Sequence, residues 1–141
     1  MRKIRIIPIK KLKPHEQTDK KNLERIKNDI HKTGCISNPV VVERDNLVIL
    51  DGHHRTKALQ LLGCTEIPVY LVDYFNDEIE VSQRRPEIKI SKEIIIKKAL
   101  AGKLFPKKTS KHFIPDRPIN LNISLEALKG NRNTAEQAKK E

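Results

Sequence analysis

The sequence predicts an α/β protein, of the α+β kind, in which helices pack on a small mixed sheet. Short runs rich in Val and Ile alternate with longer segments whose apolar residues recur at helical spacing. Gly, Pro or Asn residues separate most of these segments, as expected between strands and helices. The chain has 141 residues, 37% of them hydrophobic, which suits one domain with a modest core.

The first strand is expected over residues 5–10, which are rich in Ile. Pro8 has no backbone N–H to donate, so this strand must lie at a sheet edge or end early. The helix that follows has an N-cap at Thr18 or Asp19 and is expected to stop at Gly34. Its apolar residues recur at helical spacing: Leu23, Ile26 and Ile30.

The middle of the chain predicts a hairpin, a helix and another strand. Residues 40–42 and 47–50 are valine- and leucine-rich runs, and the polar turn between them predicts that they pair. A helix is expected over 56–62 and a strand over 67–72. The polar stretch after that strand is expected to be a loop, in which 78–81 has strand character.

The C-terminal part begins with a helix over 92–101, for which Ser91 is the expected N-cap. Residues 105–112 have no period and are expected to be irregular. We expect residues 1–125 to form a single domain, in which 90–125 supply this helix and a basic segment that folds back on the rest. Residues 126–141 are expected to be a flexible tail.

The composition restricts the partners. The chain has 29 Lys and Arg against 18 Asp and Glu, a net charge of +11, and the excess is larger after residue 90. This favours an anionic partner, either nucleic acid or a phosphorylated small molecule. The alternative is a basic surface that is merely solvated. No apolar run is long enough for a membrane span or a signal peptide, so we expect a cytoplasmic protein without a membrane partner.

The most informative segment is Asp51-Gly52-His53-His54-Arg55, between a strand and a helix. Gly52 lets the backbone approach a ligand closely, and the first amides of the helix attract an anion. Arg55 can bind phosphate oxygens in a fork, and the two histidines can donate hydrogen bonds. Asp51 is expected to hold Mg²⁺ beside the phosphates. The alternative is a capped helix with surface polar residues; a zinc site is not expected, because adjacent histidines diverge on a helix.

Several motifs together resemble a known family. The strand and its "Leu-x-Pro" connection (residues 12–14), the helix, the run 38–42, the hairpin and the helix start at 52–55 resemble the N-terminal domain shared by ParB-like partition proteins and sulfiredoxins. Within that group, the turn 51–55 and Pro14-His15-Glu16 look most like the free L-serine kinases. These enzymes phosphorylate the hydroxyl of free serine with ADP or ATP. The run 99–112 resembles their C-terminal substrate motif.

The resemblance implies a role for each motif. Glu16 would be the general base that takes the proton from the serine hydroxyl. Mg²⁺ would be placed by Asp51, and the donor, ADP or ATP, would be held by its phosphates. The residues implied to bind those phosphates are Gly52, His53, His54, Arg55 and Thr56. The residues implied to bind the amino acid or the transferred group are Lys108, Thr109, Ser110, Lys111 and His112.

The chain also departs from that family, and other interpretations stay open. It has no Trp where the family often has an aromatic residue near 83–85, and the segment 73–89 is shorter than in the kinases. The alternative function is a ParB-like nucleotide- or DNA-binding regulatory or partition module without catalysis, although no recognition helix pair follows residue 90. A sulfiredoxin-like enzyme would need a Cys where His53 and His54 stand. The donor, the acceptor and the oligomeric state are left open.

Overall fold

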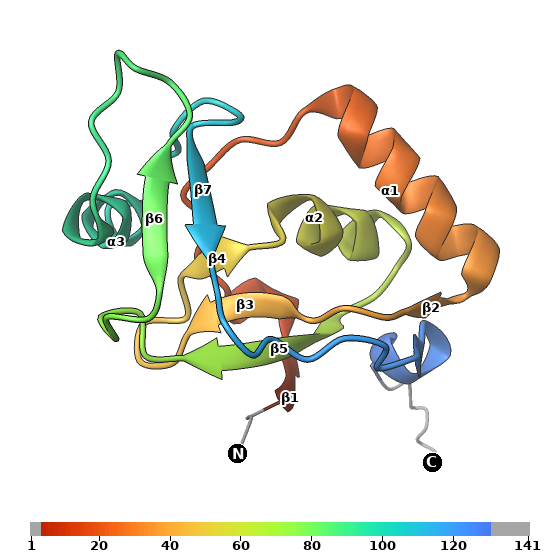
Figure 1. Cartoon of the computed structure of the whole chain (residues 1–141). Coiled ribbons are helices and arrows are strands. Elements are labelled where there is room, and N and C mark those ends of the chain that lie inside the picture. Colours follow the sequence, from red (N-terminus) through yellow and green to blue (C-terminus); the bar gives the residue numbers. More distant parts are fainter. Residues whose placement is uncertain (1–3, 131–141) are drawn as a thin grey trace.

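A four-stranded mixed sheet forms the centre of the protein, as predicted (Figure 1). The computed structural model describes residues 4–130. The strand order is β1-β5-β3-β4, with β3 and β5 parallel and the two outer pairs antiparallel. The strands are β1 (Ile4–Pro8), β3 (Val40–Glu43), β4 (Ile49–Asp51) and β5 (Glu66–Val72).

The N-terminal predictions are confirmed. β1 is an edge strand that ends at Pro8 and passes into the 3₁₀ turn η1 (Ile9–Lys11). β3 and β4 form the expected hairpin, with a bulge between Val41 and Val42. Since the side chains of β3 alternate, Val40 and Val42 pack on one face of the sheet and Val41 packs on the other.

Two helices cover the first face: α1 (Lys20–Thr33) and α2 (His53–Leu61) (Figure 1). The caps of α1 agree with the prediction, because the Asp19 side chain accepts the backbone N–H of Lys21 and Gly34 adopts the left-handed conformation at φ 73°. α2 begins at His53 and not at Thr56, so the histidines and Arg55 form its first turn.

The second face is covered by α3 (Lys92–Leu100) and by a two-stranded ribbon of β6 (Glu80–Gln83) and β7 (Ser110–Phe113). Ser91 caps α3, as predicted. Strand β7 corrects the prediction that 105–112 is irregular. Its side chains alternate between half-buried and exposed, but the half-buried ones are polar, so the run lacks the apolar alternation that marks a strand.

The end of the described chain returns to the first face. β8 (Ile123–Ser124) pairs with β2 (Cys35–Ile36), and the 3₁₀ turn η2 (Glu126–Leu128) follows. Leu128 is fully buried in the core, so the tail cannot begin at residue 126 as expected. The rest of that predicted tail, 131–141, lies outside the described residues. Between residues 4 and 130, no helix is long and apolar enough to span a membrane.

Candidate active site

The turn between β4 and α2 is built around Gly52. This residue has φ 111°, and a Cβ added to it would lie 2.8 Å from Cγ2 of the buried Val40. Only glycine therefore fits here without displacing the sheet. Gly52 is the N-cap of α2 and supplies no side-chain cap, which leaves the amides of the first turn without an intrahelical acceptor. Such amides, with the positive end of the helix dipole, attract anions.

Asp51, the last residue of β4, faces two guanidinium groups. Its Oδ2 lies 2.6 Å from Nη1 of Arg117 and 3.8 Å from Nη2 of Arg55. Burial alone would raise the pKa of Asp51, but the charges of Arg55 and Arg117 hold it below its ordinary value. The carboxylate is therefore ionised at neutral pH and fixes both cations at the turn.

Arg55 is held by the backbone as well as by Asp51. Its Nη2 donates to the carbonyl oxygen of Pro39 at 3.1 Å. Its Nε is buried and has no partner among residues 4–130. A buried N–H without an acceptor is costly, and it is common where a ligand supplies the acceptor. Arg55 thus has one unused donor beside the α2 amides.

Glu16 lies in the connection between η1 and α1, and its carboxylate binds the start of β7. Oε2 accepts the backbone N–H of Lys108 at 3.0 Å, and Oε1 accepts the backbone N–H and the hydroxyl of Ser110 at 3.1 and 2.9 Å. Backbone bonds between this connection and Phe105 support the contact. The fold therefore joins two of the predicted motifs, which lie more than 90 residues apart in the chain.

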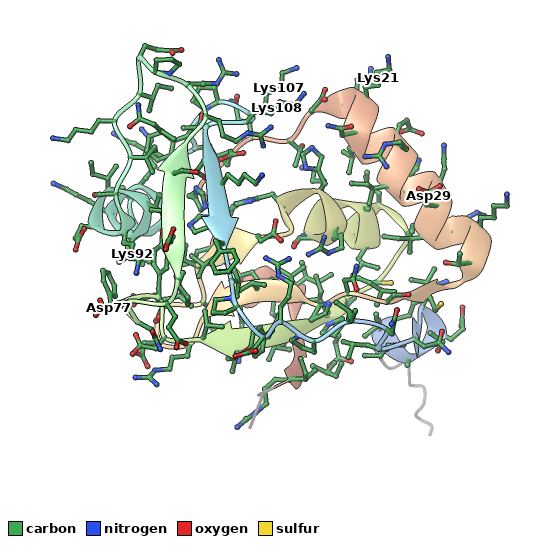
Figure 2. The ribbon with its side chains drawn as sticks, in the orientation of Figure 1. Lys21, Asp29, Asp77, Lys92, Lys107 and Lys108 are labelled. Carbon is green, nitrogen blue, oxygen red and sulfur yellow. The ribbon has the colours of Figure 1, made fainter. Side chains whose placement is uncertain are left out.

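Glu16 and the Gly52 turn border the same cavity, which has a volume of about 710 Å³. Five cationic side chains and two carboxylates line it, so it favours an anion with several charges. Figure 2 shows Lys107 and Lys108 at the turn before β7, near the start of α1. The charged residues that line the cavity are Glu16, Asp51, Arg55, Arg84, Lys108, Lys111 and Arg117.

Three neutral histidines, His15, His53 and His112, lie close together beside Glu16 and the Gly52 turn. The rings of His15 and His53 are 4.6 Å apart, and those of His15 and His112 are 6.1 Å apart. Burial lowers the pKa of His15 to about 4 and that of His112 to about 3, and it holds that of His53 well below its ordinary value. The hydroxyl of Tyr74 lies 2.8 Å from Nε2 of His112.

The two motif histidines do not contact the cavity in the way the sequence suggested. Nε2 of His53 accepts the backbone N–H of His15, and Nε2 of His54 accepts that of Asp19. These nitrogens are acceptors, so they cannot also donate to a phosphate as expected. Both residues still line the cavity, but their Nε2 atoms are committed to the connection that carries Glu16.

The other predicted residues divide into two groups. Lys108, Ser110, Lys111 and His112 line the cavity. The threonines do not: the Thr56 hydroxyl donates to the carbonyl oxygen of Gly52 at 2.9 Å, and that of the fully buried Thr109 donates to Pro106. Both hydroxyls are thus used to fix local backbone, which is the ordinary role of threonine near a helix start or in a turn.

The sequence matches the ParB N-terminal domain family over residues 1–84, more than half of the chain. The chain belongs to this family. The matched part of this ParB-type domain includes Glu16 and the Gly52 turn, whereas the β7 residues of the cavity lie beyond it.

Two curated relatives of this ParB-type domain are L-serine kinases. The ADP-dependent L-serine kinase SerK of Thermococcus kodakarensis is 36% identical over 87 residues, which is 59% of this chain and 36% of the relative. An ATP-dependent L-serine kinase of Staphylothermus marinus is 30% identical over 87 residues, 59% of this chain and 34% of the relative. The aligned part thus spans about a third of these relatives.

The fold of the ParB-type domain is also that of a solved kinase structure. A glutamate-to-alanine variant of a free serine kinase in complex with ADP superposes with a TM-score of 0.81 at 18% identity. The superposition covers 89% of this chain and 93% of the other. The likeness therefore extends past the 84 matched residues and includes most of the C-terminal part.

Three site residues of the ParB-type domain were not among the predicted ligands: Arg84, Arg117 and Tyr74. Arg117 could have been noticed in the sequence, because it follows the run 99–112 that resembles the substrate motif of the kinases. Its pairing with Asp51, however, is a long-range contact that the sequence does not reveal. Arg84 stood in a polar stretch expected to be a loop and lies just after β6, where its N–H donates to Thr109. No local pattern marks Tyr74, whose hydroxyl reaches His112 from the segment after β5.

The surroundings of Asp51 in the described part of the chain do not favour the Mg²⁺ expected there. Among residues 4–130, no group of three or more His, Cys, Asp or Glu side chains could hold one. Asp51, the expected ligand of Mg²⁺, contacts two guanidinium groups through one oxygen, and a cation there would be repelled by both.

Proposed function

We propose that this protein is a small-molecule phosphotransferase that moves a phosphoryl group from ADP or ATP to the hydroxyl of free L-serine. One observation carries the proposal: the Glu16 carboxylate accepts a serine hydroxyl, that of Ser110, at 2.9 Å in a cavity that the first residues of α2 also line. A general base must come within hydrogen-bonding distance of the hydroxyl that it activates. The similarity to relatives named L-serine kinases supports the same reaction.

The phosphates would be bound at the α2 end of the cavity. The amides of Gly52 and of the first turn of α2 can donate to phosphate oxygens, and the Nε of Arg55 supplies a charged donor that has no acceptor among the described residues. Arg117 and Arg84 add positive charge on the side of β7 and β6. Phosphoryl transfer needs mainly alignment and neutralisation of charge, and this end of the cavity offers both.

The acceptor would bind at the Glu16 end. The hydroxyl of free serine takes the place of the Ser110 hydroxyl on Oε1 of Glu16, and its proton passes to that carboxylate. Its oxygen forms a bond to the terminal phosphorus, while the bond from that phosphorus to the bridging oxygen breaks and AMP or ADP leaves. Lys111 lines the cavity and can pair with the carboxylate of the amino acid.

Magnesium enters this proposal only as part of the substrate. Mg²⁺ commonly reaches a kinase bound to nucleotide phosphates and keeps several waters. The paired state of Asp51 argues against a resident ion, so we assign Asp51 to holding Arg55 and Arg117. No step of the reaction depends on a metal ligand from the protein.

Phosphorus NMR with Mg²⁺, L-serine and either ADP or ATP tests the proposal. We expect a new phosphomonoester signal together with AMP or ADP, and the donor that gives it identifies the nucleotide. Glu16→Gln should abolish the signal and leave nucleotide binding in place, because the amide cannot accept the proton. Glu24→Gln, the same change at a carboxylate on α1 that pairs with Lys27, is the matched control and should keep full activity.

The alternative, a nucleotide- or DNA-binding module without catalysis, predicts a different result. It gives bound nucleotide or DNA, no new signal with either donor, and no effect of Glu16→Gln. Binding to DNA through Lys and Arg would also weaken steeply with salt, whereas binding of one nucleotide in the cavity would weaken less.

A further inference from the structure

The two histidines that begin α2 both accept hydrogen bonds from the connection that carries Glu16. Nε2 of His53 lies 3.1 Å from the backbone nitrogen of His15, and Nε2 of His54 lies 2.9 Å from that of Asp19. Glu16 lies between these two anchored amides. We propose that His53 and His54 are positioning residues that hold Glu16 against the phosphate-binding turn. This proposal rests on the proposed function of Glu16 as the general base.

The connection needs such anchors because it has little regular structure of its own. Residues 12–19 lie between η1 and α1 and form only isolated bridges. The amide of Leu12 donates to the carbonyl oxygen of Ile9 within the 3₁₀ turn, and those of Lys13 and Gln17 donate to the carbonyl oxygens of Leu47 and Phe105, both at 2.9 Å. The amides of His15 and Asp19 donate instead to the two imidazoles. Every second amide from 13 to 19 is therefore tied to another part of the fold, with Glu16 in the centre.

Two adjacent histidines are needed because they point in different directions. Successive residues of a helix are rotated by about 100°, so neighbouring rings at its start reach separate points. The ring of His53 reaches the amide just before Glu16, and that of His54 reaches the amide three residues after it. One histidine would anchor only one of the two amides that flank Glu16.

The acceptor role also fixes the state of both rings. A neutral imidazole that accepts at Nε2 carries its proton on Nδ1. The Nε2 atoms are then unable to donate to phosphate oxygens, so the only N–H donor of each ring is its Nδ1. The sequence pairs Pro-His-Glu with Gly-His-His-Arg because the second motif holds the backbone of the first.

His54→Leu and His54→Gln test the proposal, because the first removes the acceptor and the second keeps a neutral one. In the kinase assay we expect His54→Leu to lower kcat about 100-fold, as expected for a displaced catalytic group, and to change the Kd for ADP or ATP less than about threefold. His54→Gln should restore most of kcat. His31→Leu, at the exposed end of α1, is the matched control and should have wild-type values.

Amide hydrogen exchange supplies a readout that does not depend on activity. In His54→Leu the amide of Asp19 should exchange faster, and so should that of Ser110, whose acceptor is Glu16. In His54→Gln both should remain protected. If His54→Leu does not fold, His53→Gln is compared with His53→Leu, and the amide of His15 is followed instead.

The outcomes separate this proposal from the proposed function. A loss of nucleotide affinity with unchanged kcat would make His54 a phosphate ligand and overturn the proposal. So would unchanged exchange at Asp19 in the folded His54→Leu protein, or no rescue by His54→Gln. If the wild-type protein has no kinase activity, the proposed function fails, and exchange at Asp19 and Ser110 alone decides whether the histidines hold Glu16.

Discussion

Nη1 of Arg117 donates a hydrogen bond to Oδ2 of Asp51 at 2.6 Å, and this bond ties the segment after β7 to the end of β4. The same oxygen faces Arg55, so one carboxylate pairs with a cation from α2 and with one from the segment after β7. The Gly52 turn and the C-terminal segment therefore share a counter-charge, and a change at any of the three residues affects both.

A double-mutant cycle measures that link. Asp51→Asn and Arg117→Gln should each lower the free energy of unfolding, and the pair should couple by only about 1 kcal/mol, because both side chains are partly exposed. Urea denaturation of the wild type, the two single variants and the double variant gives the coupling. Strict additivity of the two changes would contradict the bond.

Gly52→Ala should be more harmful than the same change at another glycine of positive φ. Its new Cβ would meet Val40 at 2.8 Å, whereas nothing lies within 4 Å of a Cβ at Gly63, where φ is 89°. We expect a loss of about 3 kcal/mol for Gly52→Ala and about 1 kcal/mol for Gly63→Ala, since only the first adds a clash to backbone strain. Equal losses in urea denaturation would show that the turn relaxes freely.

The buried histidines should make the fold sensitive to mild acid. The pKa is about 4 for His15 and about 3 for His112, both below the ordinary 6.5 of the unfolded chain. The unfolded chain therefore takes up protons first, so stability is full above about pH 6.5 and falls as the pH decreases toward 4. Thermal melts between about pH 7.5 and pH 5 should show this fall as a decrease in Tm. The decrease in Tm per pH unit should be smaller in His15→Leu. An identical slope would exclude His15 as a source.

Glu43 should be essential for stability although it is remote from the reaction. This carboxylate is 3% exposed and accepts the backbone N–H of Asp45 at 2.7 Å and of Tyr74 at 3.0 Å. In Glu43→Gln the side-chain NH₂ group would face one of these two backbone N–H groups, so one hydrogen bond is lost. The free energy of unfolding, measured by urea denaturation, should fall by about 2 kcal/mol. Glu80→Gln, at an exposed position of β6, should cost almost nothing, and a similar loss for both would contradict this role.

The parts of the fold that were predictable are those with local causes. The bounds of α1 follow from Asp19 and Gly34, and the edge position of β1 follows from Pro8. β7 was missed because its inward residues, Ser110 and His112, are polar and serve the cavity rather than the core. A pattern of apolar residues cannot reveal a strand whose inner side faces a ligand site.

The candidate site was predictable in its members and less so in their roles. The Gly52 turn and Glu16 could be found from motifs, but whether His53 donates or accepts depends on backbone that lies 38 residues earlier in the chain. The same holds for Asp51: its place at the end of a strand predicts a metal ligand, whereas in the fold it pairs with Arg117, which lies 66 residues later in the chain. Such contacts are set by tertiary structure, and no local spacing encodes them.

The contact between Glu16 and Ser110 also sets the order in which the protein can mature. Its partners are 94 residues apart, so a chain growing on the ribosome exposes Glu16 long before Ser110 has been made. The central sheet can form from the first 72 residues, while closing so long a loop carries an entropic cost that only the assembled sheet offsets. The cavity is thus completed only after residues 108–112 have been made, and a chain shortened before them would have Glu16 and the Gly52 turn without the β7 residues that complete the lining.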